Sequence, residues 1–266
     1  MLNYVIILLI SIATSTISAM VGLGGGLLLI PFIILFFGLP FKMAAGAMLV
    51  AMVPYTAIAS IKNFKNGYIS FKVGLLMETG SVVGVVLGAN FTHLVPDFVL
   101  KTIFVSLVLY LMLTLQIPKD SPYNYVARFF NLLNFIPPKL KILPENSGKT
   151  SLVALFIVGS IAGFFSGMLG IGGGFLKTPV LIVGLGLAPK IAVGTALFMI
   201  MITAFFGAST HIYLGDVNFK LAIAITIGMM IGAYIGSSIL KTQPDKRVKR
   251  YIFITMFVAG ILTLFK

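Results

Sequence analysis

Two short glycine clusters are the most chemically suggestive feature of this sequence. The first reads GLGGG at 22–26 and the second GIGGG at 170–174. Neither is a nucleotide-binding fingerprint, because Leu27 stands where a further spaced glycine is required and no Walker lysine follows. Each cluster instead supplies bare backbone N–H groups at the start of a helix, expected at Leu27 and Phe175, where free amides and the helix dipole attract anions. The clusters predict an anion-binding site; close backbone packing at a helix crossing is the alternative.

Ionisable side chains are rare inside the apolar segments. Glu78 and Lys177 are the two clear cases, and such groups are functional candidates by default, with a mutual ion pair as the structural alternative. His211 could take up a proton near neutral pH, or could simply lie at the membrane interface. Hydroxyl side chains also occur in the segments that precede the clusters: Ser11, Thr14, Ser15, Thr16, Ser18, Ser160 and Ser166.

The composition defines the elements that must position these groups. The chain has 266 residues, of which 59% are hydrophobic and 9% charged, against roughly 25% charged residues in soluble domains. Its mean hydropathy is +1.12. Several runs of about 20 apolar residues match the length of helix that crosses a bilayer core, and the short alternating segments of a barrel are absent. We therefore predict an all-α polytopic membrane protein.

The charge and the scarce metal-binding residue types exclude other classes. The net charge is +13, but the 19 Lys and Arg lie mostly at the ends of apolar runs, which indicates a membrane surface and no nucleic acid. Cysteine is absent and there are two His and six acidic residues, so we expect no disulfide, metal centre or cofactor. The lack of clustered carboxylates, His or Cys also argues against an enzyme.

The sequence contains an internal repeat. Shifting the chain by 148 residues aligns 18–101 with 166–249 without a gap, and 24 of the 84 pairs are identical. The repeat divides the chain into a first transmembrane half (1–116), a linker (117–150) that we expect in the cytoplasm, and a second transmembrane half (151–266). In the linker, 125–135 could form an amphipathic segment on the membrane surface or a plain connector.

Each half contains the same predicted elements: a first arm, the glycine cluster, a short second arm and three long helices. The arms are expected at 3–21 and 27–37, and at 151–169 and 175–185. The long helices are expected at 43–61, 70–94 and 98–116, and at 191–211, 219–240 and 248–265. Glycines at four-residue spacing, which we interpret as helix-packing faces, follow in both halves: Gly80, Gly84, Gly88, Gly228, Gly232 and Gly236.

The distribution of basic residues favours inverted halves. If each glycine cluster lay within one continuous span, the two sides of the membrane would hold 10 and 8 basic residues. If each cluster is the tip of a broken-helix hairpin, one side holds 14 and the other 4, with Lys177 inside the second hairpin. Cytoplasmic loops carry excess Lys and Arg. We therefore predict two inverted-topology repeats with both termini external, whether the hairpins are re-entrant or fully crossing.

The paired motifs resemble the TauE/SafE family of sulfite-exporter-like permeases. They read Met20-Val-Gly-Leu-Gly-Gly-Gly with Pro31 and Met168-Leu-Gly-Ile-Gly-Gly-Gly with Pro179, and the resemblance covers essentially the whole chain. It implies a multi-pass protein of the cytoplasmic membrane of a prokaryote that moves sulfite, sulfoacetate or related organosulfonates. With Lys177 added, the expected substrate-binding residues are Gly22, Gly24, Gly25, Gly26, Pro31, Gly170, Gly172, Gly173, Gly174, Lys177 and Pro179.

We therefore expect a secondary transporter that exports a small sulfur-containing anion by alternating access around two facing glycine tips. Side chains at Gly25 or Gly173 should exclude the positive-φ conformations that a tip can use. Coupled protons are a candidate second partner because sulfite is a weak acid. A gated anion channel and an uptake permease for another small anion are the alternatives, and the anion, its direction and the oligomeric state are left open.

Overall fold

The computed structural model describes residues 2–118, 120–141 and 149–264, and almost all of its regular structure is helical. The first half contains α1 (Leu2–Val21), α2 (Gly26–Phe37), α3 (Phe41–Lys65), α4 (Phe71–Phe91), the short 3-10 helix η1 (Thr92–Leu94) and α5 (Asp97–Gln116). The second contains α7 (Leu152–Leu169), α8 (Gly174–Pro179), η2 (Val180–Gly184), α9 (Pro189–Tyr213), α10 (Phe219–Thr242) and α11 (Asp245–Leu264).

Six of the described helices are long and apolar enough to cross a membrane: α3, α4 with η1, α5, α7, α9 and α10. The prediction of an all-α polytopic membrane protein is confirmed. The predicted second arms begin one residue earlier than expected, at Gly26 and Gly174, because a glycine serves as the first helical residue of each. The 12 residues of α2 rise about 18 Å, well short of a bilayer core of about 30 Å.

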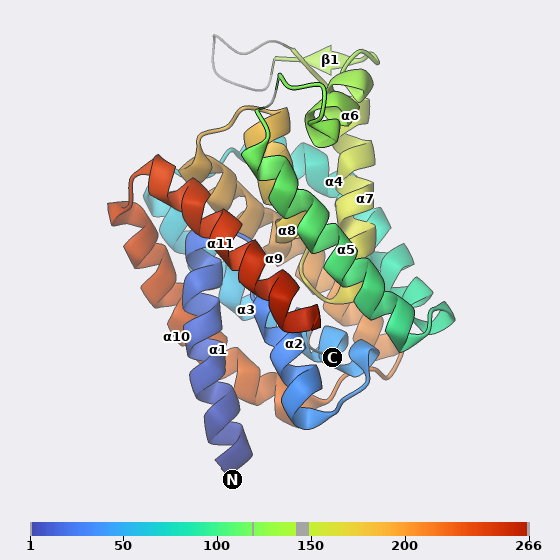
Figure 1. Ribbon diagram of the computed structural model, residues 1–266, viewed down its shortest axis with the longest axis vertical. Helices are drawn as coiled ribbons and strands as arrows, with labels where there is room; N and C mark the ends of the chain where they lie inside the picture. Colours follow the sequence, from blue (N-terminus) through green and yellow to red (C-terminus); the bar gives the residue numbers. More distant parts are fainter. Residues whose placement is uncertain (1, 119, 142–148, 265–266) are drawn as a thin grey trace.

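The two glycine-tipped hairpins approach each other from opposite ends of the bundle. Helix α1 begins at one end of the bundle, and α6 (Tyr125–Leu133) lies at the other (Figure 1). The arms α1 and α2 extend into the bundle from the end at which α1 begins, whereas α7 and α8 extend into it from the end that holds α6 (Figure 1). The assignment of these ends to membrane faces, and with it the inverted topology, stays a prediction.

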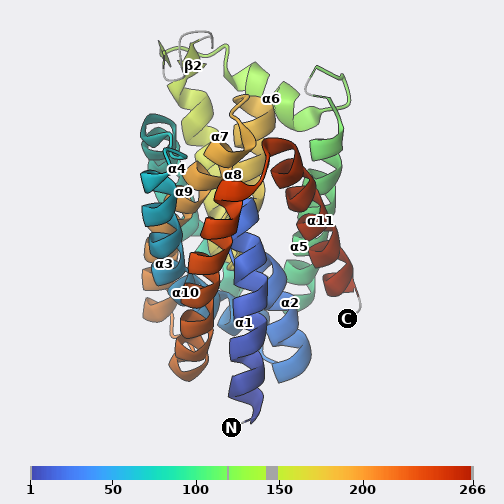
Figure 2. The same ribbon diagram turned by 90° about the vertical axis from the view of Figure 1, so that its left-hand side faces the viewer.

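Helices of the two halves pack on each other more closely than on their own neighbours. The first arm α1 lies beside α10, α7 lies beside α4, and α3 lies against α9 (Figure 2). The glycine stripes create these contacts. A Cβ at Gly84 would overlap the carbonyl oxygen of Ser160, and one at Gly163 would overlap that of Ser81. The interpretation of the stripes as packing faces therefore agrees with the structure.

The second hairpin differs from the first beyond its glycine tip. Pro31 leaves α2 helical, but after Pro179 the chain widens into the π-helical segment η2, where the Leu185 N–H donates to Val180 O at 3.1 Å. Phe130 of α6 covers this segment, since a Cβ at Gly184 would lie 3.0 Å from its ring.

The linker includes the amphipathic helix α6 and an antiparallel strand pair. In α6, Ala127 and Phe130 are buried while Phe129 and Leu132 are exposed. Strands β1 (Lys139–Leu140) and β2 (Thr150–Ser151) pair with Lys139 opposite Ser151. One face of α6 therefore packs on the protein and the other presents apolar side chains, as expected for a segment at a membrane surface.

Candidate functional site

The two glycine turns meet backbone to backbone in the buried centre of the bundle. A Cβ added at Gly24 would lie 2.6 Å from Ile171 O, and one at Gly26 would lie 2.7 Å from Gly170 O. From the other side, a Cβ at Gly174 would lie 2.5 Å from Gly22 O. No side chain larger than hydrogen fits these positions without displacing the opposite backbone. The sequence clusters 22–26 and 170–174 are thus brought together, as predicted.

Both turns use the left-handed backbone region that favours glycine. Gly22 and Gly24 have φ of +70° and +75°, and their repeat equivalents Gly170 and Gly172 have φ of +70° and +78°. These angles reverse the chain within a few residues. They also leave successive N–H groups outside the hydrogen-bond ladder of the preceding helix.

The turns contain a row of buried backbone N–H groups without partners. Within the described chain, no hydrogen bond is donated by the amides of Leu23, Gly24 or Gly25, nor by those of Gly172 or Gly173. The first amides of α2 and α8 are likewise unpaired, as in any helix start. Buried N–H groups are rarely left unsatisfied in native proteins, so a concentration of them marks a place for an acceptor.

The two turns differ at their last non-helical glycine. Gly173 has φ of +74°, as expected, and a Cβ there would lie 3.2 Å from Ser166 Cβ and 3.4 Å from Lys177 Cε. Gly25 has φ of −62°, which any residue adopts, and there a Cβ would meet the terminal methyl of Met229. The expectation that a side chain at Gly25 would exclude a required positive φ is therefore wrong.

Lys177 forms a buried cluster with Glu78 and Thr203. Its Nζ donates to Glu78 Oε1 and, at 2.5 Å, to Thr203 Oγ1. The Thr203 hydroxyl lies 2.6 Å from Glu78 Oε2, to which it donates. Lys177 is 0% exposed and Glu78 3% exposed, so both charges depend on this pairing. The ion pair that the sequence left as an alternative is present, next to the second turn.

Thr203 could not be identified from the sequence. It lies 26 residues from Lys177 and 125 from Glu78, and hydroxyls of this kind are frequent in the apolar helices. The first half has no counterpart of the cluster, because the repeat equivalents are Leu29, Thr226 and Tyr55. Apart from the different φ of Gly25 and Gly173, the two turns are therefore symmetric in their backbone, whereas the side chains around them are asymmetric.

Several buried hydroxyls near these elements have no hydrogen-bond partner. Ser18 and Ser166 occupy equivalent repeat positions, both are 0% exposed, and neither Oγ is bonded. The Tyr55 hydroxyl, at the position equivalent to Thr203, is also buried and unbonded. Unpaired buried hydroxyls usually mark bound water or another ligand. Ser166, beside Gly173, therefore belongs with the free amides of the second turn.

The two prolines of the motif lie farther along the second arms. Pro31 and Pro179 are buried inside α2 and α8, beyond the first helical turn. Each removes the hydrogen bond that the carbonyl four residues earlier would have accepted. They shape the arms but do not add donors to the turns.

The turns are enclosed on all sides, and the described cavities lie elsewhere. A cavity of about 560 Å³ between α5 and α11 is lined by Lys246, Lys249 and Arg250. An apolar cavity of about 200 Å³ lies under α6 and reaches Leu176 and Val180 of the second hairpin. Every glycine of both clusters is buried. The structure is therefore closed around the turns.

Helices of membrane length surround two hairpins whose tips carry buried, unpaired amides. This arrangement is that of a multi-pass membrane transporter. The sequence model of the family described as "Sulfite exporter TauE/SafE" matches residues 7–263. The chain belongs to this family, and the family resemblance of the motifs is confirmed. Its relatives are membrane transporters, so the protein is a transporter and no enzyme.

Individual relatives support the same class. "Probable membrane transporter protein YdhB" of Bacillus subtilis is 27% identical over 98% of this chain and 100% of its own length. "Probable membrane transporter protein YunE" of the same organism is 23% identical over 100% of this chain and 98% of its own length. "Sulfite exporter TauE/SafE family protein 1" of Arabidopsis thaliana is 26% identical over 43% of this chain and 25% of its own. No solved structure matches the chain.

Proposed function

We propose that the protein is a secondary transporter that exports a small sulfur-containing anion, such as sulfite or an organosulfonate, across the cytoplasmic membrane of a prokaryote. The observation that supports this most directly is the pair of facing glycine turns with buried, unpaired N–H groups. Such groups bind an oxyanion without needing a formal positive charge. The family description, which names a sulfite exporter, supports the same substrate class.

The amides rather than Lys177 supply most of the attraction in this proposal. Glu78 neutralises Lys177, so the cluster has little net charge. An oxyanion between the turns would accept hydrogen bonds from the N–H groups of Gly24 and Gly25 and from those of Gly172 and Gly173. Ser166 would add a hydroxyl donor from the second half.

Alternating access would move the two hairpins relative to each other around this contact. The glycine contacts bind α1 to α10 and α4 to α7, so each pair would move as one body. Each body combines helices of both halves. The closed turns favour a carrier, in which access requires helix movement, over an open channel.

The distribution of basic residues supports an assignment of the ends of the bundle to the membrane faces. The end that holds α6 also holds the 62–72 and 241–250 loops, and so most of the Lys and Arg. By the positive-inside rule this end is cytoplasmic, and both termini are external. Export then begins at the end of the second hairpin.

The test is sulfite counterflow in proteoliposomes. The wild-type protein should give saturable uptake of radiolabelled sulfite against unlabelled sulfite loaded inside. Gly173→Leu should abolish it in a folded, inserted protein, because the side chain would fill the space between Ser166 and Lys177. Linear, non-saturating flux in the wild type would show that the protein acts as a channel and not as a carrier.

A matched control separates occlusion from backbone strain. Gly186 has φ of +70°, close to the +74° of Gly173, but open space surrounds its Cβ position. Gly186→Leu should therefore show similar strain and normal counterflow. Normal counterflow with Gly173→Leu at normal expression would show that the anion binds elsewhere.

A further inference from the structure

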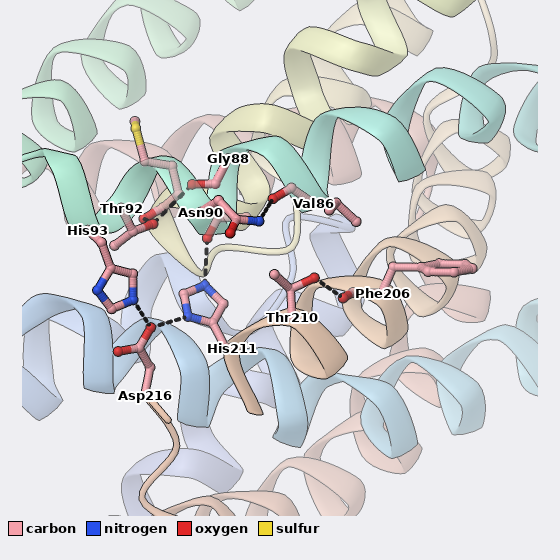
Figure 3. A network of polar contacts seen from close by, with 11 residues as sticks. Val86, Gly88, Asn90, Thr92, His93, Phe206, Thr210, His211 and Asp216 are labelled. Carbon is pink, nitrogen blue, oxygen red and sulfur yellow. Dashed lines mark hydrogen bonds and ion pairs between the residues drawn. The ribbon is translucent and has the colours of Figure 1, made fainter. Parts of the chain in front are cut away.

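Two histidines and an aspartate from both halves meet beside the last turn of α9 (Figure 3). His93 Nε2 lies 2.8 Å from Asp216 Oδ2, and His211 Nδ1 lies 3.0 Å from the same oxygen. The other ring nitrogen of His211, Nε2, lies 2.9 Å from the backbone oxygen of Gly167. His93 comes from η1, His211 from the last turn of α9, and Asp216 from the loop before α10.

The hydrogen-bond pattern fixes the number of protons in this cluster. Gly167 O can only accept, so His211 Nε2 must carry a proton. The bond between His211 Nδ1 and Asp216 then needs a second proton, either on Nδ1 or on the carboxyl group. In both cases the cluster holds one proton more than a neutral imidazole beside a carboxylate.

His93 is the solvent-exposed member of this cluster. His211 is 0% exposed and Asp216 is 4% exposed, whereas His93 is 33% exposed. Imidazole is the side chain that ordinarily exchanges a proton near neutral pH. His93 can therefore pass a proton between water and the buried pair.

The cluster is connected to the second glycine turn. Gly167 lies in the last turn of α7, three residues before Gly170, at which the turn begins. The neighbouring carbonyl of Met168 accepts a hydrogen bond from Thr92 Oγ1 at 3.2 Å. If His211 loses its extra proton, Nδ1 keeps the remaining one for Asp216 and the Gly167 carbonyl loses its donor.

Other charged groups do not substitute for the cluster. The elements packed around it are η1, α7, α9 and α3, whose Gly46 faces the His211 side chain. Lys42 lies in the first turn of α3, Lys220 lies in the first turn of α10, and Asp97 begins α5. Within the described chain, no hydrogen bond or ion pair joins these three residues to the cluster; Asp97 instead accepts from the Phe41 N–H.

The cluster is also a departure from the repeat. The positions equivalent to His211, Asp216 and His93 are Asn63, Tyr68 and Lys241. Asn63 donates to its own helix at Ala59 O. The shared fold therefore does not require a titratable group at this place.

We propose that His93, Asp216 and His211 form the proton-binding site of this transporter, and that proton occupancy controls the position of the second glycine turn. The part of this proposal that concerns transport rests on the proposed function. Losing the donor to a buried carbonyl shifts an equilibrium about 5- to 150-fold. Release of the proton from this cluster would thus free the last helical turn of α7 and the glycine turn that follows it.

The chain contains just two histidines, which makes a direct test possible. Uniform ¹⁵N-histidine labelling and NMR of the protein in lipid report both rings, with His93→Gln assigning the signals. Across a pH series, the His211 signals of the wild type should report one proton that is shared with Asp216. In Asp216→Asn that shared proton should be lost. An unchanged protonation state of His211 across this series would overturn the proposal.

Transport provides the second measurement. Methanesulfonate is the probe, because it stays ionised throughout the pH range. An inward or outward pH gradient should drive its flux, and Asp216→Asn should reduce this driven flux about 5- to 150-fold. Counterflow without a gradient should fall less than the driven flux, because exchange requires no net release of a proton. Thr210→Val is the control, because Thr210 lies one residue from His211 and its hydroxyl donates to Phe206 O.

The outcomes separate this proposal from the proposed function. If Asp216→Asn does not fold, His93→Gln should show the slowed proton exchange, since it removes the exposed member. If wild-type flux is absent for sulfite and methanesulfonate, the proposed function fails, and the NMR titration still decides the proton site. Equal gradient-driven flux in wild type and both variants would overturn the proton site.

Discussion

Replacing one member of the Lys177–Glu78 pair should leave the other as an uncompensated buried charge. Both side chains are almost completely buried, and Thr203 is the further polar group that bonds to both. Removing one partner of such a pair costs about 3–5 kcal/mol, whereas replacing both is often neutral. We expect losses of this size in unfolding free energy for Lys177→Met and for Glu78→Gln, and a smaller loss for the double change.

The measurement is a double-mutant cycle by denaturant titration in mixed micelles. It should give a coupling energy of about 3 kcal/mol or more, because the two changes share one interaction. Two losses that simply add would show that the pair does not exist in the inserted protein. That result would refute the claim that Lys177 and Glu78 form part of the candidate site as an ion pair.

Anion binding provides an independent readout of the same variants. Lys177→Met should weaken sulfite binding more than Glu78→Gln, because it leaves a carboxylate beside the second turn whereas the other change leaves a cation. Sulfite at a hundredfold excess over its Kd should stabilise a binding-competent protein by about 2.7 kcal/mol. Equal loss of this stabilisation in both variants would assign the pair to folding alone.

Three further predictions concern the backbone and the topology. Gly173→Ala should lower the free energy of unfolding by about 1–2 kcal/mol, because it forces alanine into the left-handed region. Gly25→Ala should be nearly neutral, since φ is ordinary there and the flexible Met229 methyl can move. Thermal unfolding compares the two variants. Gly163→Leu should yield no monodisperse protein in size-exclusion chromatography, because the side chain would overlap a helix backbone. Reporter fusions in the 62–72 and 241–250 loops should both report cytoplasm; opposite sides would refute the inverted halves.

Local sequence information was sufficient for the elements and for their order. Apolar runs of membrane length predict the helices, because backbone amides in lipid must bond within their own segment. The ungapped repeat places a glycine-tipped hairpin in each half, and the four-residue glycine spacing predicts close helix packing. The position of the two turns as facing backbones also follows from these patterns, since glycine is the residue that permits so close an approach.

The partners of the side chains were decided by the tertiary structure. Helical periodicity tells which residues share a face, but it does not give the rotation and register of that face against another helix. Glu78 meets Lys177 across 99 residues because α4 and α8 come from different halves. His93 meets Asp216 across 123 residues for the same reason. Gly25 and Gly173 occupy equivalent repeat positions but differ in φ and in the side chains packed on them, which the repeat alone does not reveal.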